Sequence, residues 1–167
     1  MANLFWGKKK VALINMDGNK LVDEIAKALK AKGFWNVLIF EAVGTYAAYY
    51  HVAEAEPDFA LFVDESKECK VQPMQIKGYP STPPYGYTQR DTDKSNEAKP
   101  FFRHELRMLG LEPKVLGARE IEWADVKDIP WYYRTDAPML NLQVPATEGL
   151  GRAVAEATAD YFAKGRR

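Results

Sequence analysis

Short apolar runs that alternate with helical stretches are the feature that most constrains how this chain folds. The first three runs lie at 11–15, 36–42 and 58–66, and they are rich in β-branched and aromatic residues. Because these runs are apolar on both faces, they predict strands that are buried on both sides of a sheet. Helices between the strands would then cover the two faces of that sheet.

The remaining elements follow from turn and capping residues. A helix is expected from Asn19 to Gly33, because Leu21, Ile25 and Leu29 recur at helical spacing and glycine favours a helix end. Further helices are expected at 44–56, 100–109, 121–129 and 147–165, and further strands at 113–118 and 137–146. In the 100–109 helix, Pro100 is expected in the first turn.

The predicted fold is a single α/β domain over residues 1–167, with a mostly parallel or mixed sheet of about five or six strands and helices on both faces. Residues 1–9 are expected to form a flexible N-terminal flank. Residues 67–99 are expected to form a long loop rich in proline and tyrosine, in which 71–79 could be an edge strand.

Charge and composition exclude several classes of function. Lys+Arg and Asp+Glu both number 23, so no global field attracts nucleic acid, and we expect no such partner. One cysteine forbids an intrachain disulfide, and two histidines cannot complete a conventional zinc site without carboxylates. No apolar run is long enough to span a bilayer, and the first ten residues do not form a secretory signal, which is most consistent with a cytoplasmic or phage-encoded protein.

Four segments have the order and character of a known family: "VALINMDGNK", "DFALFVDES", "YRTDAPMLNLQVPA" and "GLGRAVAEATADYFAKG". Together they resemble the zinc-dependent N-acetylmuramoyl-L-alanine amidases, which cut between the glycan and the stem peptide of peptidoglycan. In that family two histidines and a glutamate hold zinc, and a late glutamate acts as general base on the zinc-bound water. The resemblance implies an amidase-like fold from about Val11 to Gly165.

The residues at the family's functional positions differ from those the zinc chemistry needs. The resemblance places Asp17 at the first histidine, Asn19 near the zinc glutamate, Ser66 at the second histidine and Gln143 at the catalytic glutamate. Gln143 cannot accept a proton near neutral pH, and of the four residues only Asp17 binds a metal well. The resemblance therefore implies a remnant cleft of Asp17, Asn19, Ser66 and Gln143 with neither metal nor cofactor.

Other polar residues offer weaker alternatives. Asp17 with Asp64 or Glu65 could form a carboxylate site for a hard cation, although strand alternation sends Asp64 and Glu65 to opposite faces. Asp17 is more simply a turn former. His51, His104 and Cys69 are expected to pack or to lie on the surface rather than to act in catalysis.

Aromatic residues in the second half suggest a binding surface. Tyr79, Tyr85, Tyr87, Trp131 and Tyr133 are candidates to contact a ligand, although they could equally anchor loops. We expect a non-catalytic domain that binds a cell-wall fragment, a peptide or a protein partner. The alternatives are an active hydrolase with a metal site rearranged around Asp17 and Asp64, and a structural or assembly protein that forms a homo-oligomer.

Overall fold

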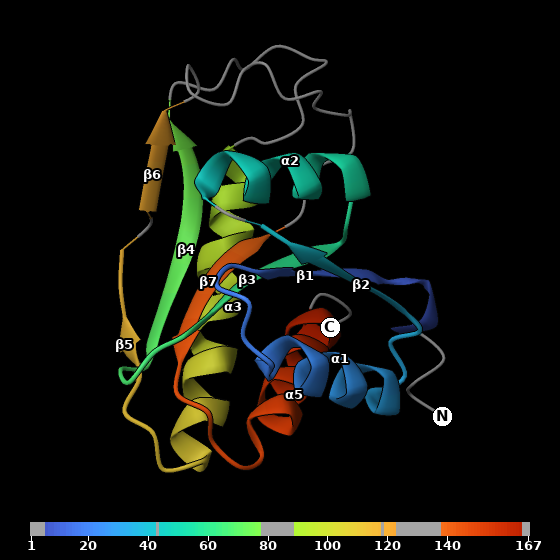
Figure 1. Cartoon of the computed structure of the whole chain (residues 1–167), viewed down its shortest axis with the longest axis vertical. Coiled ribbons are helices and arrows are strands. Elements are labelled where there is room, and N and C mark those ends of the chain that lie inside the picture. The colour runs from blue at the N-terminus through green and yellow to red at the C-terminus, as the bar shows by residue number, and fades with distance from the viewer. Residues whose placement is uncertain (1–5, 43, 78–88, 118, 123–137, 165–167) are drawn as a thin grey trace.

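A computed structural model describes residues 6–42, 44–77, 89–117, 119–122 and 138–164 (Figure 1). The strands are β1 Lys10–Asn15, β2 Asn36–Glu41, β3 Phe59–Glu65, β4 Lys70–Lys77, β5 Lys114–Val115, β6 Arg119–Glu122 and β7 Met139–Val144. The helices are α1 Leu21–Lys32, α2 Thr45–Ala55, α3 Gln89–Met108 and α5 Leu150–Lys164. Within the described ranges, no helix is both long and apolar enough to cross a membrane.

The strands form one mixed sheet. Six of them follow the order β2-β1-β3-β7-β4-β5, and β6 pairs with β4 as the seventh strand. β1, β2, β3 and β7 are parallel, while β4 is antiparallel to β7 and parallel to β5 and β6. The predicted single α/β domain with a mixed, mostly parallel sheet is confirmed, and the described residues contribute seven strands to it in place of the expected five or six.

Helices cover both faces of the sheet, as predicted. In Figure 1, α1 and α5 lie on one side of β1 and β2, and α2 lies on the other side. One core contains residues of α1, α3 and α5, among them Leu29, Phe102 and Val154. A second core joins Val52 of α2 to the opposite face of the sheet, where it meets Phe62. The central strands β1 and β3 are therefore buried on both faces of the sheet, which explains their continuous apolar sequences.

The expected loop at 67–99 is wrong in two places. β4 occupies 70–77 and lies between β7 and β5, so it is an interior strand and not an edge strand. α3 begins at Gln89, so Pro100 lies inside this helix and not in its first turn. The buried side chains of Ala98, Phe102 and Leu106 lie on the helix face that packs in the core, which offsets the cost of an internal proline.

A proline inside an interior strand also needs an explanation. The amides of Lys114 and Leu116 donate to the carbonyls of Cys69 (2.9 Å) and Val71 (3.0 Å), so alternate residues of β4 point their backbone toward β5. Pro73 is the next residue in this alternation. It lies past the β5 pairing and before the β6 pairing, which starts at residue 74. The missing N–H of Pro73 therefore falls at the break between two short strands, where proline is tolerated.

Three further expectations need correction. β2 is the edge of the sheet, and Ile39 in it is 41% exposed, so this strand is not buried on both faces. Trp6 is buried and stacks on Phe34 at 5.6 Å between ring centroids, so the flank expected at 1–9 is packed from residue 6 onward. The first two residues of the helix expected at 121–129 lie in β6, and the remainder lies outside the described residues.

Candidate functional site

The carboxyl ends of β1, β3 and β7 bring the predicted site residues to one edge of the sheet. Asn15 ends β1, Glu65 ends β3 and Val144 ends β7, and these strands are adjacent and parallel. Open α/β sheets place their ligands at this edge. The turn at 16–20, which carries Asp17 and Asn19, follows β1 directly and leads into α1.

Asp17 uses both carboxylate oxygens to hold the turn. Oδ1 accepts a hydrogen bond from the side-chain amide of Asn19, and Oδ2 accepts one from the backbone N–H of Glu65 at 3.0 Å. Gly18, with a φ of +69°, gives the left-handed conformation that bends the turn between Asp17 and Asn19. Asp17 therefore ties the turn after β1 to the tip of β3, as a turn former does.

The side-chain oxygen and nitrogen of Asn19 also form hydrogen bonds within the turn and to β3. Its Oδ1 accepts the N–H of Leu21, the first residue of α1, at 2.9 Å, although Lys20 and not Asn19 occupies the N-cap position. Its Nδ2 donates to Asp17 and to the carbonyl of Val63 at 3.1 Å. The side-chain oxygen of Asn19, the atom that a metal ion would need, faces the helix amide.

Ser66 and Gln143 lie around the end of β7. The backbone N–H of Ser66 donates to the carbonyl of Val144 at 2.9 Å, and its Oγ accepts the N–H of Glu68 at 3.2 Å. Gln143 is half-buried and lies between Asp64 of β3 and Lys70 of β4 in the strand register. The structure thus joins Asp17 to Asn19 directly, places Ser66 just after β3, the strand next to β1, and places Gln143 one strand further away, on β7.

Two residues that sequence reasoning missed complete the turn. Asn15 is 2% exposed, and its side chain accepts the N–H of Asn19 at 3.1 Å and donates to the carbonyl of Asn19 at 2.8 Å. Its Nδ2 also donates to Oε1 of Glu41, at the end of β2, at 3.2 Å. An asparagine at the end of an apolar strand, just before a turn, is a signal from which this role could have been predicted.

His51, His104 and Cys69 pack in the protein or lie on its surface, as expected, and they do not form a catalytic group. His51 stacks on Phe40 with ring centroids 4.7 Å apart, and its Nε2 lies 3.1 Å from the carbonyl of Glu41. His104 is exposed on α3. Cys69 is buried, and burial raises the pKa of its thiol, which disfavours the reactive thiolate.

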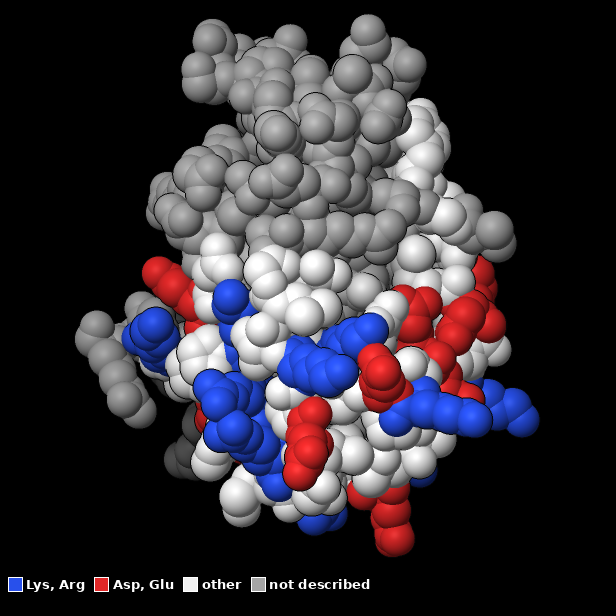
Figure 2. All heavy atoms as spheres, turned by 90° about the vertical axis from the view of Figure 1, so that its left-hand side faces the viewer, with Lys and Arg blue, Asp and Glu red and all other residues white. Residues whose placement is uncertain are grey.

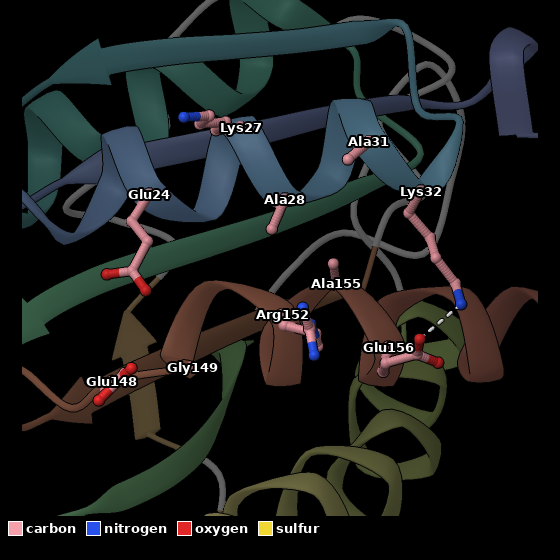
Figure 3. Close-up of a pocket in the computed structure, with 10 residues that line it drawn as sticks. All are labelled: Glu24, Lys27, Ala28, Ala31, Lys32, Glu148, Gly149, Arg152, Ala155 and Glu156. Carbon is pink, nitrogen blue, oxygen red and sulfur yellow. Dashed lines mark hydrogen bonds and ion pairs between the residues drawn. The ribbon is translucent and has the colours of Figure 1, made fainter.

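A groove of about 590 Å³ lies between α1 and α5 (Figure 3). Glu24 crosses it, and its Oε1 accepts the N–H of Gly151 at 3.2 Å. Lys32 pairs with Glu156 at 2.6 Å at the other end. The groove is lined by Glu24, Lys27, Ala28, Ala31, Lys32, Glu148, Gly149, Arg152, Ala155 and Glu156. None of the four predicted cleft residues is among them.

The donors at the carboxyl edge do not fit the zinc ion that the zinc-dependent amidases bind. Zinc in proteins is held by about three His, Cys or carboxylate groups with an open position. Among the described residues, no group of three His, Cys, Asp or Glu is arranged to hold a metal ion. Asp17 is the one ionisable member of the predicted set, and hydrogen bonds occupy both of its oxygens.

The predicted aromatic surface cannot be placed, because Tyr79, Tyr85, Tyr87, Trp131 and Tyr133 lie outside the described residues. Figure 2 shows one face of the molecule, on which Lys and Arg side chains lie among Asp and Glu side chains over the described part. This mixture of signs agrees with the formal net charge of zero.

Comparison with known proteins identifies the fold. No family model matches the chain, and no curated protein matches it in sequence. Among solved structures, the chain is similar to a bacteriophage poly-γ-glutamate hydrolase, with a TM-score of 0.53 and 8% sequence identity. The match covers 95% of this chain and 86% of that one. The fold is that of a phage hydrolase. At 8% identity this likeness shows the shared architecture, and it does not carry the chemistry of one site to the other.

Proposed function

We propose that this chain is a degenerate, non-catalytic member of the amidase-like hydrolases, which binds a peptide fragment of the cell wall at the carboxyl edge of its sheet. The observation that carries the proposal is the hydrogen bonding of Asp17, whose oxygens accept from Asn19 and from the amide of Glu65. A carboxylate used in this way acts as a structural link between β1 and β3.

The residue at the expected position of the general base argues in the same direction. Amide hydrolysis through a metal-bound water needs a group that takes a proton from that water. Gln143, which the amidase resemblance puts at the position of the catalytic glutamate, has no titratable group. Ser66 directs its oxygen to the amide of Glu68, within its own turn. The fold persists because the core lies below this edge, in the strands and helices.

The charge of the edge indicates the class of ligand. Asp17, Glu41 and Glu65 are exposed near the carboxyl ends of three adjacent strands. Their carboxylates favour amide and amine donors and repel a polyanion. We therefore propose a peptide ligand that presents N–H groups or an amine, such as a stem-peptide fragment of peptidoglycan, and we expect poly-γ-glutamate to bind poorly.

Metal analysis and hydrolysis assays test the non-catalytic part of the proposal. The purified protein, incubated with zinc and then dialysed, is expected to retain far less than one zinc ion per chain. It is expected to leave both peptidoglycan and poly-γ-glutamate uncleaved. Stoichiometric zinc together with cleavage of either polymer would overturn the proposal and favour an active hydrolase with a rearranged site.

Calorimetric titration with soluble peptidoglycan fragments tests the binding part. Glu65→Gln removes one exposed charge from the edge and is expected to weaken binding several-fold, because a carboxylate acceptor is lost. Glu54→Gln is the matched control, since Glu54 is exposed on α2. Equal affinity of both variants, or no binding by the parent protein, would contradict the proposed ligand class.

A further inference from the structure

β2 is an edge strand of the sheet formed by the described residues. It pairs with β1 on one side, and in the part of the chain that the structure describes no strand pairs with its other side. Residues 36–40 read Asn-Val-Leu-Ile-Phe, without charge, proline or glycine. Natural proteins usually protect a sheet edge with lysine, proline or a bulge, because an open edge binds other strands. β2 contains neither lysine nor proline, and its one charged residue, Glu41, lies at its carboxyl end.

The hydrogen bonds to β1 decide which groups of β2 face outward. The N–H of Ala42 donates to the carbonyl of Asn15 at 3.0 Å, so the even-numbered residues of this segment point their backbone toward β1. Backbone groups alternate in direction along a strand. The N–H and C=O groups of Val37, Ile39 and Glu41 therefore point away from the sheet.

One of these three positions already has a partner. The Nε2 of His51 lies 3.1 Å from the carbonyl of Glu41, and the imidazole stacks on Phe40. His51 of α2 thus closes the end of the open edge. Val37 and Ile39 remain as the residues that offer both a donor and an acceptor to an incoming strand.

We propose that β2 pairs antiparallel with β2 of a second copy of this chain, about a two-fold axis at Leu38. In an antiparallel pair, residues that face each other either both point their backbone at the partner or both point away. With the axis at Leu38, Val37 of each copy lies opposite Ile39 of the other. Both open positions are then used, and the sheet runs continuously through two copies.

The side chains favour a second copy over an unrelated strand. In the proposed register the apolar side chains of Val37 and Ile39 of one copy face those of Ile39 and Val37 of the other, and the two-fold axis makes both contacts identical. Leu38 meets its own copy, and Glu41 lies opposite Trp35, so no like charges face each other. Trp35 and Ile39 are 66% and 41% exposed, and both lie on the side of β2 that carries Val37. Pairing would cover this apolar row, which is costly to leave in water.

Sedimentation equilibrium over a concentration series tests the assembly. The parent protein is expected to reach twice the monomer mass as its concentration rises. Ile39→Lys places a charge in the centre of the interface and is expected to raise the dissociation constant at least tenfold. Met108→Lys is the matched control, because Met108 is 73% exposed on α3 and lies away from β2. A protein that stays monomeric at all concentrations, or equal dimerisation of both variants, would overturn the proposal.

Disulfide trapping tests the register, and it decides the matter if Ile39→Lys fails to fold. In a Cys69→Ala background, Leu38→Cys places two thiols in facing positions about 4.5 Å apart between Cα atoms, within disulfide range. Asn36→Cys, on the same strand and the same face, sets its two thiols four residues apart in register, roughly 13 Å. Covalent dimers from Leu38→Cys alone are expected. Equal yields, or none from Leu38→Cys, would reject the two-fold axis at Leu38.

Discussion

At the scale of single residues, the carboxyl edge is a network in which Asn15, Asp17 and Asn19 hold one another. Asn15 fixes the backbone of Asn19, and Asn19 donates to Asp17. Asp17 in turn accepts from the amide of Glu65 on the neighbouring strand. Each side chain is short and polar, and each satisfies a backbone or side-chain group that the turn would otherwise leave unpaired.

Asp17→Ala is expected to lower the free energy of unfolding by about 1–2 kcal/mol, because two hydrogen bonds to a carboxylate are lost at a partly solvated site. Urea titration measures the change. Glu54→Ala, on the exposed side of α2, is the control and is expected to change stability by about 0.5 kcal/mol or less. A carboxylate kept for catalysis commonly costs stability, so a more stable Asp17→Ala variant would contradict the structural role.

Glu105 gives a pH-dependent prediction. Burial raises the pKa of Glu105, and the nearby carboxylate of Asp160 adds to this rise. Glu105 therefore binds a proton more readily in the folded protein than in the unfolded chain. This contribution to stability is fully present below the ordinary pKa and is lost as the pH rises through the raised pKa.

Glu105→Gln mimics the protonated acid, so it is expected to be more stable than the parent at about pH 7 by about 0.5 kcal/mol or less, and equal to it at about pH 3. Glu68→Gln is the matched control of opposite sign. A hydrogen bond from Lys70 and the charge of Lys114 lower the pKa of Glu68, so this variant loses stability at neutral pH. A stability difference for Glu105→Gln that persists at acid pH would contradict the shifted pKa.

At the scale of elements, the close approach of α1 and α5 depends on one glycine. A Cβ on Gly151 would lie 2.7 Å from the backbone oxygen of Glu24, in the first turn of α1. The same two residues are joined by the hydrogen bond from the Gly151 N–H to the Glu24 carboxylate. Neither backbone can move without shifting a whole helix.

Gly151→Ala has two opposing effects on stability, and the steric clash with Glu24 is expected to outweigh the gain in helix propensity. Helix propensity favours alanine by about 1 kcal/mol, whereas overpacking of a rigid contact costs about 1–3 kcal/mol. The net result is a less stable protein by urea titration. Arg152→Ala, one residue later and exposed, is expected to be neutral or slightly stabilising. A gain of about 1 kcal/mol for Gly151→Ala would mean that the helices separate freely.

At the scale of the whole molecule, the alternation of apolar runs and helical stretches predicted the layered fold correctly. The predicted ends of α1 at Gly33 and of α2 before Pro57 also hold. What the pattern could not supply is the neighbour of each strand. β2 and β1 look equally apolar, yet β2 is the edge, and β4 is interior although it contains Pro73. These positions depend on pairing between distant segments.

The candidate site was predicted only in part, because its contacts also join segments that lie far apart in the chain. The residue types at Asp17 and Asn19 predict a turn and a helix cap. The structure has the turn, and Asn19 accepts the N–H of Leu21, although Lys20 is the N-cap residue. Their decisive contacts, to Val63 and Glu65, lie more than forty residues away in the chain. Sequence spacing does not reveal such contacts. Likewise, the polar start of α3 at Gln89–Glu97 has no apolar residues at helical spacing from which a helix could be predicted.

The position of β7 in the sheet determines when during synthesis this protein can fold. β7 inserts between β3 and β4, although it is the last strand of the described chain. A polypeptide emerging from the ribosome therefore holds a gap at the centre of its sheet until residue 144 has appeared. Compaction must wait for nearly the full length of translation, and any truncated product that stops before β7 exposes two apolar strand edges to proteolysis and aggregation.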